Sequence, residues 1–239
     1  MLQQSDAFAA LAASPSAAPA VFGYWKIRGL AQPIRTLLAF TKTPVVEVAY
    51  GDGAAEEARW TEDKRAQPAL GFAFPNLPYL ATAAGVRLTQ STAILEHVAR
   101  AHPHLNLLGA TPAAADLCSL WLMQAVDARG AISGWAYGAE AALPPTLVEG
   151  AALAPFEAAL GERAFCAGDA PTVADFVLVE MLLHVRAIVA ARGGAADVLA
   201  ARFPRLHALV GRFEKLPGVS EALAAAALLP WNGDTAQFR

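Results

Sequence analysis

Two short segments rich in β-branched and aromatic residues, with one helical segment between them, most constrain the fold of this chain. The first covers about residues 20–25, and the second is PVVEVAY at 44–50. Between them, residues 33–41 place their apolar side chains at helical spacing. Two neighbouring strands that are joined through a helix run parallel, with a right-handed crossover. The sequence therefore predicts a βαβ unit.

An antiparallel arrangement is predicted next. After a polar stretch at 51–67 come FPNLPYL at 74–80, the turn ATAAG, and VRLT at 86–89. This pattern is typical of a β-hairpin. A helical pattern at 91–100 follows the hairpin. The order βαβ then ββα predicts a small α/β domain that ends near residue 102.

The rest of the sequence reads as helical throughout. The connection HPHLNLLGATP at 102–112 separates the two compositions, and Thr172 to Asp175 has the form of a capping box at the start of a buried helix. We therefore expect an α/β domain at 19–102, a linker at 103–112 and an all-α domain at 113–239, after a flexible extension at 1–18. The predicted helices cover about 113–137, 146–160, 172–191, 203–215 and 218–228.

Composition argues against several classes of partner. The net charge is −3 and the basic residues are scattered, so nucleic acid is not expected. The longest uncharged run contains Pro15 and Pro19, which does not fit a membrane span. Two cysteines without a CxxC motif favour a reducing cytoplasm, with Cys118 a buried thiol rather than a nucleophile. No metal site is expected, and the HPH cluster at 102–104 reads as a loop.

Two short stretches leave alternatives open. Pro78 begins a predicted strand, and the Leu77–Pro78 bond is either an ordinary trans bond or a cis bond that turns the Leu77 backbone outward to pair with an extended peptide. Gln90 and Ser91 lie at the mouth of a helix, where free N–H groups bind a carboxylate or phosphate. Ser91 could equally serve only as an N-cap.

Taken together, several motifs resemble one family. They are GYWKIRGLAQPIRTLLAFT at 23–41, FPNLPYL, LTQSTAILEHVAR at 88–100, FCAGDAPTVADF at 165–176 and FPRLHALVGRFEKLPGVS at 203–220. In this order they resemble the cytosolic glutathione S-transferases, most of all the mu class. The resemblance implies a thioredoxin-like domain with a cis-proline that binds glutathione, a helical bundle that forms most of the electrophile pocket, and a homodimer.

The resemblance gives Tyr24 the catalytic role. The tyrosine at this position in the family points its hydroxyl at the sulfur of glutathione. A free thiol has a pKa near 8.5 and is only a few per cent ionised at pH 7. Lowering that pKa by about two units requires roughly 2.7 kcal/mol, and a charge-assisted hydrogen bond supplies about 1.5–3 kcal/mol. Without the flanking motifs, Tyr24 would read as a core residue on a strand.

The other site residues are carried over by matching positions. The expected glutathione-binding residues are Trp25, Leu30, Trp60, Lys64, Asn76, Leu77, Pro78, Gln90, Ser91 and Asp127. Asp127 would reach glutathione from the neighbouring subunit, or is simply a solvated helix residue. The electrophile is expected against Ile27, Leu30 and Tyr137, although Tyr137 could instead be a packing residue at a helix end. Phe74 matches an aromatic side chain that inserts between subunits.

The sequence departs from the family pattern in four places. It is longer between Lys64 and Phe74, which makes the Trp60 and Lys64 assignments depend on where the insertion falls. The preceding loop, 51–59, is short and rich in alanine. Glu96 replaces an arginine near the expected dimer axis. The C-terminal tail, 228–239, resembles the family only loosely, so the electrophile is not predicted.

The leading hypothesis is therefore a glutathione transferase that conjugates the thiolate of glutathione to hydrophobic electrophiles. The alternatives are a glutathione-dependent isomerase or peroxidase, which would use the same thiolate, and a non-catalytic carrier of hydrophobic ligands with the same fold.

Overall fold

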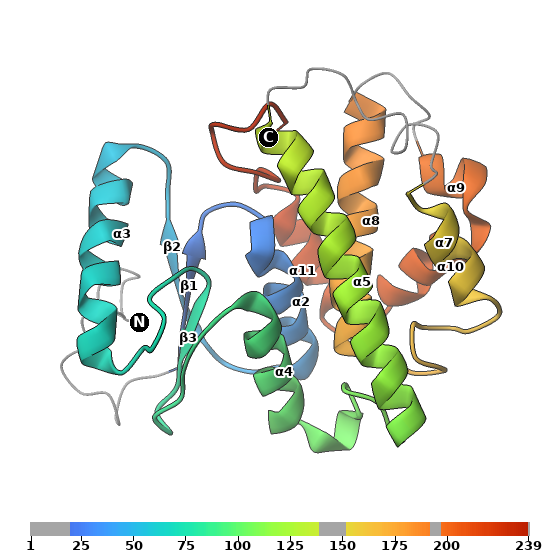
Figure 1. Ribbon diagram of the computed structural model, residues 1–239, viewed down its shortest axis with the longest axis horizontal. Coiled ribbons are helices and arrows are strands. Elements are labelled where there is room, and N and C mark those ends of the chain that lie inside the picture. Colours follow the sequence, from blue (N-terminus) through green and yellow to red (C-terminus); the bar gives the residue numbers. More distant parts are fainter. Residues whose placement is uncertain (1–19, 139–151, 192–196, 239) are drawn as a thin grey trace.

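A four-stranded mixed sheet forms the N-terminal part of the computed structural model, which describes residues 20–138, 152–191 and 197–238 (Figure 1). The strands are β1 (Val21–Trp25), β2 (Val46–Tyr50), β3 (Tyr79–Ala81) and β4 (Arg87–Thr89). Their order is β2-β1-β3-β4, with β1 parallel to β2 and the other pairs antiparallel. The predicted βαβ unit and hairpin are both confirmed, and Leu77–Pro78 is a cis bond.

Helices cover both faces of this sheet. Helices α2 (Gln32–Thr41) and α4 (Ser91–Ala101) lie between the sheet and the helical part, and α3 (Ala54–Ala66) lies on the other side (Figure 1). Short 3₁₀ helices are η1 (Gly29–Ala31), η2 (Gln67–Leu70) and η3 (Pro103–Leu105). The longer segment between Lys64 and Phe74 thus contains the end of α3 and η2.

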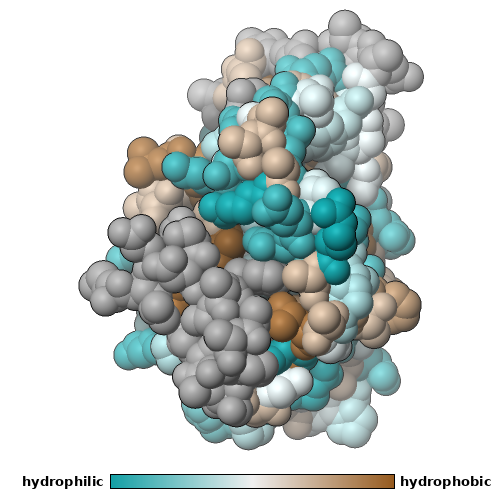
Figure 2. All heavy atoms as spheres, turned by 90° about the vertical axis from the view of Figure 1, so that its left-hand side faces the viewer, coloured by the Kyte–Doolittle hydropathy of each residue, from teal (hydrophilic) through white to brown (hydrophobic). Residues whose placement is uncertain are grey.

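The sequence analysis left α3 as an irregular polar stretch, which is wrong. None of its residues is buried, so the helix has no apolar stripe from which it could be recognised. Figure 2 looks onto this side of the molecule and shows many hydrophilic side chains beside the grey atoms. One ring anchors the helix: Trp60 packs edge-to-face on Tyr50 of β2, with ring centroids 5.4 Å apart. Tyr50 also donates a hydrogen bond of 2.6 Å to Asp63 of α3.

The remaining part is helical, as predicted. It contains α5 (Pro112–Tyr137), α7 (Ala154–Leu160), α8 (Val173–Ala191), α9 (Val198–Arg202), α10 (Pro204–Phe213) and α11 (Val219–Ala226). The helix predicted at 146–160 is seen as α7 in its described portion, and the predicted extension at 1–18 lies outside the described residues. In the described ranges, no helix is both long enough and apolar enough to span a bilayer.

The buried helix α8 joins the two parts of the molecule. Its N-terminus carries the predicted capping box, in which the Asp175 carboxylate accepts hydrogen bonds from the Thr172 N–H at 2.7 Å and the Thr172 hydroxyl at 2.9 Å. Phe176 packs on Phe40 of α2, with ring centroids 5.7 Å apart. Both cysteines, Cys118 and Cys166, are buried, as expected for Cys118, and burial raises the pKa of each thiol.

Candidate active site

A cavity of about 360 Å³ lies where the end of β1 faces α5. Its wall combines residues from both parts of the molecule: Tyr24, Ile27, Gly29, Leu30, Pro33, Ser91, Thr92, Leu95, Val126, Arg129, Gly130, Ser133, Tyr137, Val177 and Asn232. Five of the predicted site residues are therefore brought together here, namely Tyr24, Ile27, Leu30, Ser91 and Tyr137.

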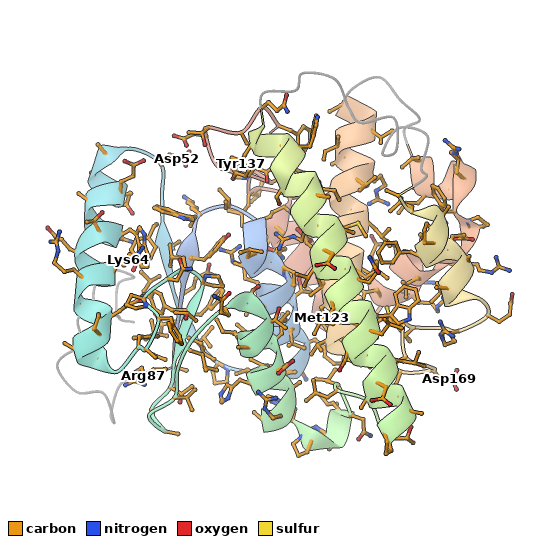
Figure 3. The ribbon with its side chains drawn as sticks, viewed as in Figure 1. Asp52, Lys64, Arg87, Met123, Tyr137 and Asp169 are labelled. Atoms are coloured by element: carbon orange, nitrogen blue, oxygen red, sulfur yellow. The ribbon has the colours of Figure 1, made fainter. Side chains whose placement is uncertain are left out.

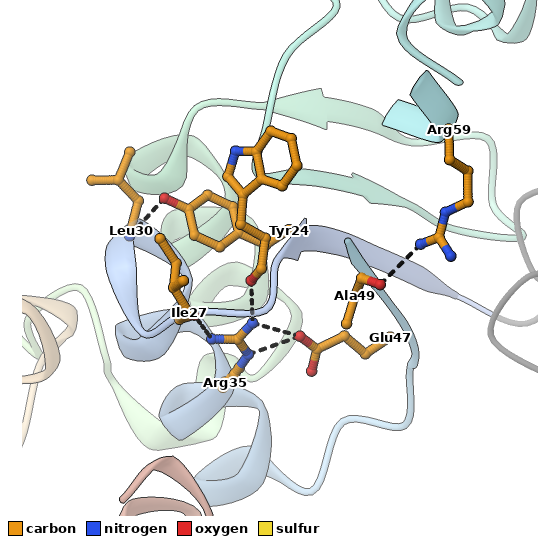
Figure 4. Close-up of polar contacts among 8 residues, drawn as sticks. Tyr24, Ile27, Leu30, Arg35, Glu47, Ala49 and Arg59 are labelled. Carbon is orange, nitrogen blue, oxygen red and sulfur yellow. Dashed lines mark hydrogen bonds and ion pairs between the residues drawn. The ribbon is translucent and has the colours of Figure 1, made fainter. Parts of the chain in front are cut away.

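Tyr24 is buried at the end of β1, with 6% of its surface exposed. Its phenolic oxygen accepts a hydrogen bond from the Leu30 N–H at 3.0 Å (Figure 4). Because the oxygen acts as the acceptor in this bond, its own proton stays available to a second partner. Burial raises the pKa of Tyr24, so at neutral pH the group is an uncharged donor.

The loop that follows β1 is held in place by one arginine. Arg35 of α2 donates to the carbonyl oxygens of Ile27 at 2.7 Å and Trp25 at 3.2 Å, and its guanidinium forms an ion pair of 2.6 Å with Glu47 of β2 (Figure 4). These contacts join the loop to both neighbouring elements. The Leu30 N–H is thereby held at the Tyr24 oxygen.

Gly29 lies directly against the Tyr24 side chain. Its φ of +40° is disfavoured for residues with a Cβ, and a Cβ added there would lie 2.7 Å from both Cε1 and the hydroxyl oxygen of Tyr24. We expect Gly29→Ala to destabilise the protein by about 1–2 kcal/mol through the backbone and to displace the phenol as well. The catalytic rate of the site should fall by about tenfold or more, given what one misplaced group costs.

Gly85→Ala is the matched control for this substitution. Gly85 also has a positive φ, of +86°, but no atom lies within 4 Å of a Cβ placed there. Steady-state kinetics and denaturant unfolding of both variants separate the two effects. Gly85→Ala should lose stability and keep activity, and full activity in a folded Gly29→Ala protein would contradict the tight contact with Tyr24.

A second cavity, of about 260 Å³, adjoins the first. It is lined by Trp25, Ile27, Gly51, Asp52, Gly53, Glu57, Tyr137, Gly233, Asp234 and Thr235. Ile27 and Tyr137 line both cavities, so the two form one continuous depression. Figure 3 shows Asp52 and Tyr137 near each other at the end of α5, with Lys64 further along α3.

One face of α5 forms the opposite wall of the first cavity. The cavity-lining residues Val126, Gly130, Ser133 and Tyr137 follow one another at spacings of four, three and four, which places them on one stripe of the helix. Gly130 and Ser133 are small and leave room for a ligand. The Tyr137 oxygen accepts a hydrogen bond of 2.7 Å from the Gly233 N–H, so its proton, too, is available to another partner.

The C-terminal segment lies directly beside this site. Its Pro230 and Trp231 carbonyl oxygens accept hydrogen bonds from the N–H groups of Arg28 and Gly29, at 2.8 and 3.1 Å. The Gln237 N–H donates to the Ala136 oxygen at 2.9 Å. The tail therefore connects the loop after β1 with the end of α5, a position that its sequence did not predict.

A buried cluster fastens this tail to α8. The Trp231 ring lies between the Arg28 guanidinium, 3.8 Å from the ring centroid, and the stacked His184 ring, 4.8 Å away. Arg28 in turn binds Glu180 of α8 through two hydrogen bonds of 2.8 and 2.7 Å. The Asn232 amide nitrogen donates to the Phe238 oxygen and to Nε2 of His184. Nε2 is therefore the acceptor nitrogen of a neutral ring.

The neutral state of His184 makes stability depend on pH. Burial, followed by the positive charges of Arg129 and Arg28, lowers the pKa of His184 to about 3. The unfolded chain binds this proton near pH 6.5 and the folded protein does not, so stability is complete above pH 6.5 and is lost as the pH falls toward 3. This group alone should cost about 2 kcal/mol between pH 6.5 and pH 5.

His184→Gln removes the titrating group and keeps a side-chain oxygen that can accept from Asn232. The free energy of unfolding, measured by urea titration between pH 7 and pH 5, should therefore fall less steeply in the variant. Equal slopes in the two proteins would contradict a neutral, buried His184.

The other predicted glutathione residues surround the cavities without all lining them. Trp25 lines the second cavity and packs on Trp60, with ring centroids 6.4 Å apart. Lys64 is exposed on α3. The Asn76 side chain accepts from the Leu77 N–H at 2.9 Å, next to Pro78. Gln90 has an unusual positive φ of 72° just before α4.

The predicted site residues Trp60, Lys64, Asn76, Leu77, Pro78 and Gln90 line neither cavity. Nor do Asp127, which is exposed on α5, and Phe74, which is 76% exposed. The structure therefore does not bring either side chain into the depression around Tyr24. Glu96, expected to meet its symmetry mate, forms an exposed ion pair of 3.2 Å with Arg100.

Sequence reasoning missed several residues of the site, of which Arg129 is the most consequential. It comes two residues after Asp127, and positions two apart on a helix point about 200° apart. A motif that matches Asp127 therefore predicts no role for Arg129. Among the described residues that line the first cavity, Arg129 is the one that carries a charge; the second cavity is lined by the carboxylates of Asp52, Glu57 and Asp234. Asn232 was missed because its contacts with α8 are remote in sequence.

Comparison with known proteins agrees with this architecture. The family model for the N-terminal domain of glutathione S-transferases matches residues 20–100, and that for the C-terminal domain matches 150–226. The chain is 36% identical over 219 residues to glutathione S-transferase Mu 1 of Bos taurus, which covers 89% of this chain and 94% of the relative. It is 34% identical over 228 residues to a glutathione S-transferase of Tyrophagus putrescentiae, covering 91% of this chain and 95% of the relative.

Solved structures agree as well. The Pi-class glutathione S-transferase of Onchocerca volvulus superposes with a TM-score of 0.73 at 26% identity, and the glutathione S-transferase Blo t 8 with a TM-score of 0.75 at 27% identity. Each superposition covers 91% of this chain and 99% of the solved chain. On the matched sequence, the shared fold and the mu-class relatives, this chain belongs to the glutathione S-transferase family.

Proposed function

We propose that this protein conjugates glutathione to small electrophiles, with Tyr24 stabilising the thiolate. The observation that carries the proposal is the Tyr24 hydroxyl, which is buried at a cavity and accepts from the Leu30 N–H. Its free proton can be donated to an anion that enters the cavity. A binding protein without chemistry has no need for a donor in this position.

Glutathione would lie along the edge of the α/β part. The N-terminus of α4, at Gln90 and Ser91, offers free N–H groups to the γ-glutamyl carboxylate. Leu77, beside the cis Pro78, would hold the cysteinyl backbone, and Trp60 with Lys64 would reach the glycyl carboxylate. This arrangement points the thiol toward Tyr24.

The electrophile would bind against Ile27, Leu30 and the α5 stripe. The glutathione sulfur attacks the electrophilic carbon, a C–S bond forms, and the leaving group departs with the electron pair of the broken bond. Holding both reactants in one cavity replaces a bimolecular encounter by an oriented reaction. Tyr137 would donate its proton to an electrophile oxygen where one is present.

We also propose that the protein acts as a homodimer. Phe74, Leu120 and Met123 are large apolar side chains that are 76%, 62% and 47% exposed. Side chains of this kind are enriched at protein interfaces. Asp127, exposed on α5 one turn after Met123, would then reach the glutathione of the second subunit.

A substrate panel on the purified protein tests the proposal. Aromatic halides, epoxides, enals and hydroperoxides are each assayed with glutathione, and the products are identified by mass spectrometry. Thioether formation supports conjugation, whereas oxidised glutathione alone would indicate a peroxidase. Tight binding of apolar dyes without turnover of any compound would indicate a carrier.

A further inference from the structure

Among the residues that the structure describes, Arg129 has no bonded counter-ion. In the parts of the chain that the structure describes, no hydrogen bond or ion pair is found for its guanidinium. Desolvation lowers the pKa of Arg129, and the groups that act against this are Tyr24, Glu180 and Tyr137. Arg129 is partly buried in the cavity wall, and a guanidinium held there without a bonded partner is costly, so a site that keeps one commonly uses it for a ligand.

Glu180 cannot neutralise Arg129, because it is already engaged. Its two carboxylate oxygens each accept a hydrogen bond from Arg28, at 2.8 and 2.7 Å. The Glu180 carboxylate is therefore bonded to Arg28 and not to Arg129. His184, which lies close to both arginines, adds no compensating negative charge since it is neutral. Among the described residues that line the first cavity, Arg129 therefore supplies the single charge, and the carboxylates of Asp52, Glu57 and Asp234 belong to the adjoining cavity.

The position of Arg129 also separates it from the groups expected to bind glutathione. It belongs to α5, beside the stripe that faces the electrophile, whereas the proposed glutathione contacts belong to the α/β part. The remaining wall near it is apolar, with Ile27, Leu30 and Val126. This combination suits a flat apolar molecule that has one negatively charged end.

We infer that Arg129 determines specificity in this cavity by binding the anionic group, such as a carboxylate, of an aromatic or apolar electrophile. The inference rests on the proposed conjugation reaction and names its substrate class. The arginine binds this group beside the reacting carbon and takes no part in bond making. Electrophiles with a carboxylate are thereby favoured over neutral ones of the same shape.

A pair of matched substrates tests this inference. In 4-chloro-3-nitrobenzoate and 4-chloro-3-nitrobenzamide the thiolate displaces the same chloride, and the two differ only in the charge opposite the reacting carbon. For Arg129→Gln, kcat/KM for the benzoate should fall at least about tenfold more than that for the benzamide, as expected for a lost charge-assisted hydrogen bond. Arg129→Lys, which keeps the charge, should retain part of the preference.

Arg186→Gln serves as the matched control. Arg186 is a partly exposed arginine on α8 that does not line the cavity. Its substitution should leave the ratio of the two substrates unchanged. Equal losses for both substrates in Arg129→Gln would place the arginine at the sulfur and overturn the inference. A raised KM for glutathione with both substrates would show that Arg129 binds a carboxylate of glutathione. That result would overturn the inference as well.

Calorimetry measures ligand binding to the wild-type protein. It therefore tests the inference without relying on the folding of a variant or on turnover of a substrate. Without glutathione, unreactive 3-nitrobenzoate should bind more tightly than 3-nitrobenzamide, and added salt should reduce the difference. Equal or weaker binding of the benzoate would overturn the inference. If the protein conjugates the benzamide but shows no preference for the anion, only this inference fails. If neither these two substrates nor any compound of the panel reacts, the proposed function fails, and calorimetry still decides the role of Arg129.

Discussion

Tyr24→Phe should lower kcat/KM for conjugation of a simple aromatic halide by about 10- to 150-fold. This range corresponds to the loss of one charge-assisted hydrogen bond, about 1.5–3 kcal/mol. The phenyl ring fills the same space, and the lost hydroxyl leaves only the Leu30 N–H without its acceptor. Folding should therefore be affected little, and the KM for glutathione should change much less than kcat, because in the proposed mechanism Tyr24 contacts only the sulfur.

Tyr79→Phe is the control for this comparison. Tyr79 is likewise buried, but it belongs to β3 and its hydroxyl lies 3.2 Å from that of Tyr50 rather than at the cavity. Steady-state kinetics of the three proteins at one pH are sufficient. Retention of activity in Tyr24→Phe, or an equal loss in Tyr79→Phe, would argue against a specific role for the Tyr24 proton.

Arg28→Met should destabilise the protein by about 3–5 kcal/mol, the largest effect on stability that we expect. The Arg28–Glu180 pair is buried, with 6% and 5% of the two side chains exposed. Removing the arginine leaves a buried carboxylate without its counter-charge, which costs far more than the pair itself contributes. The Trp231 ring also loses the guanidinium that covers it, so the C-terminal segment is held to the loop after β1 only by the backbone hydrogen bonds of Arg28 and Gly29.

Two further variants separate charge from packing. Arg28→Met combined with Glu180→Leu removes both charges and should recover a large part of the lost stability. Arg100→Met breaks the exposed pair with Glu96 and should cost less than about 1 kcal/mol. Urea unfolding of all four proteins gives the comparison. A double variant no more stable than Arg28→Met would show that packing around Trp231, rather than the unpaired charge, is responsible.

Much of the order of strands and helices was predictable from the sequence because these elements are rich in apolar residues that become buried. The β-branched and aromatic residues of β1 and the apolar face of α2 are strong signals, and they gave the βαβ unit correctly. Helix α3 was not predicted because it is polar on every side and is held mainly through Trp60 and Asp63. Tertiary contacts of that kind leave no periodic pattern.

The site was only partly predictable for a related reason. Tyr24 was found because a short local motif surrounds it. The tail was not placed, since the contacts between Pro230 and Arg28 join opposite ends of the sequence. Arg129 shares its helix with Asp127 but points to the other side. Only the structure shows that Arg28 takes both oxygens of Glu180, which leaves Arg129 without a bonded counter-ion among the described residues.

The pKa of the thiol of enzyme-bound glutathione tests the central claim most directly. It is obtained from the ultraviolet absorbance of the thiolate as a function of pH, in the wild-type protein and in Tyr24→Phe. The account predicts a pKa about two units below the ordinary value of about 8.5 in the wild type, and a value near the ordinary one in the variant. The same lowered pKa in both proteins would contradict it, because the thiolate would then owe its stability to another group.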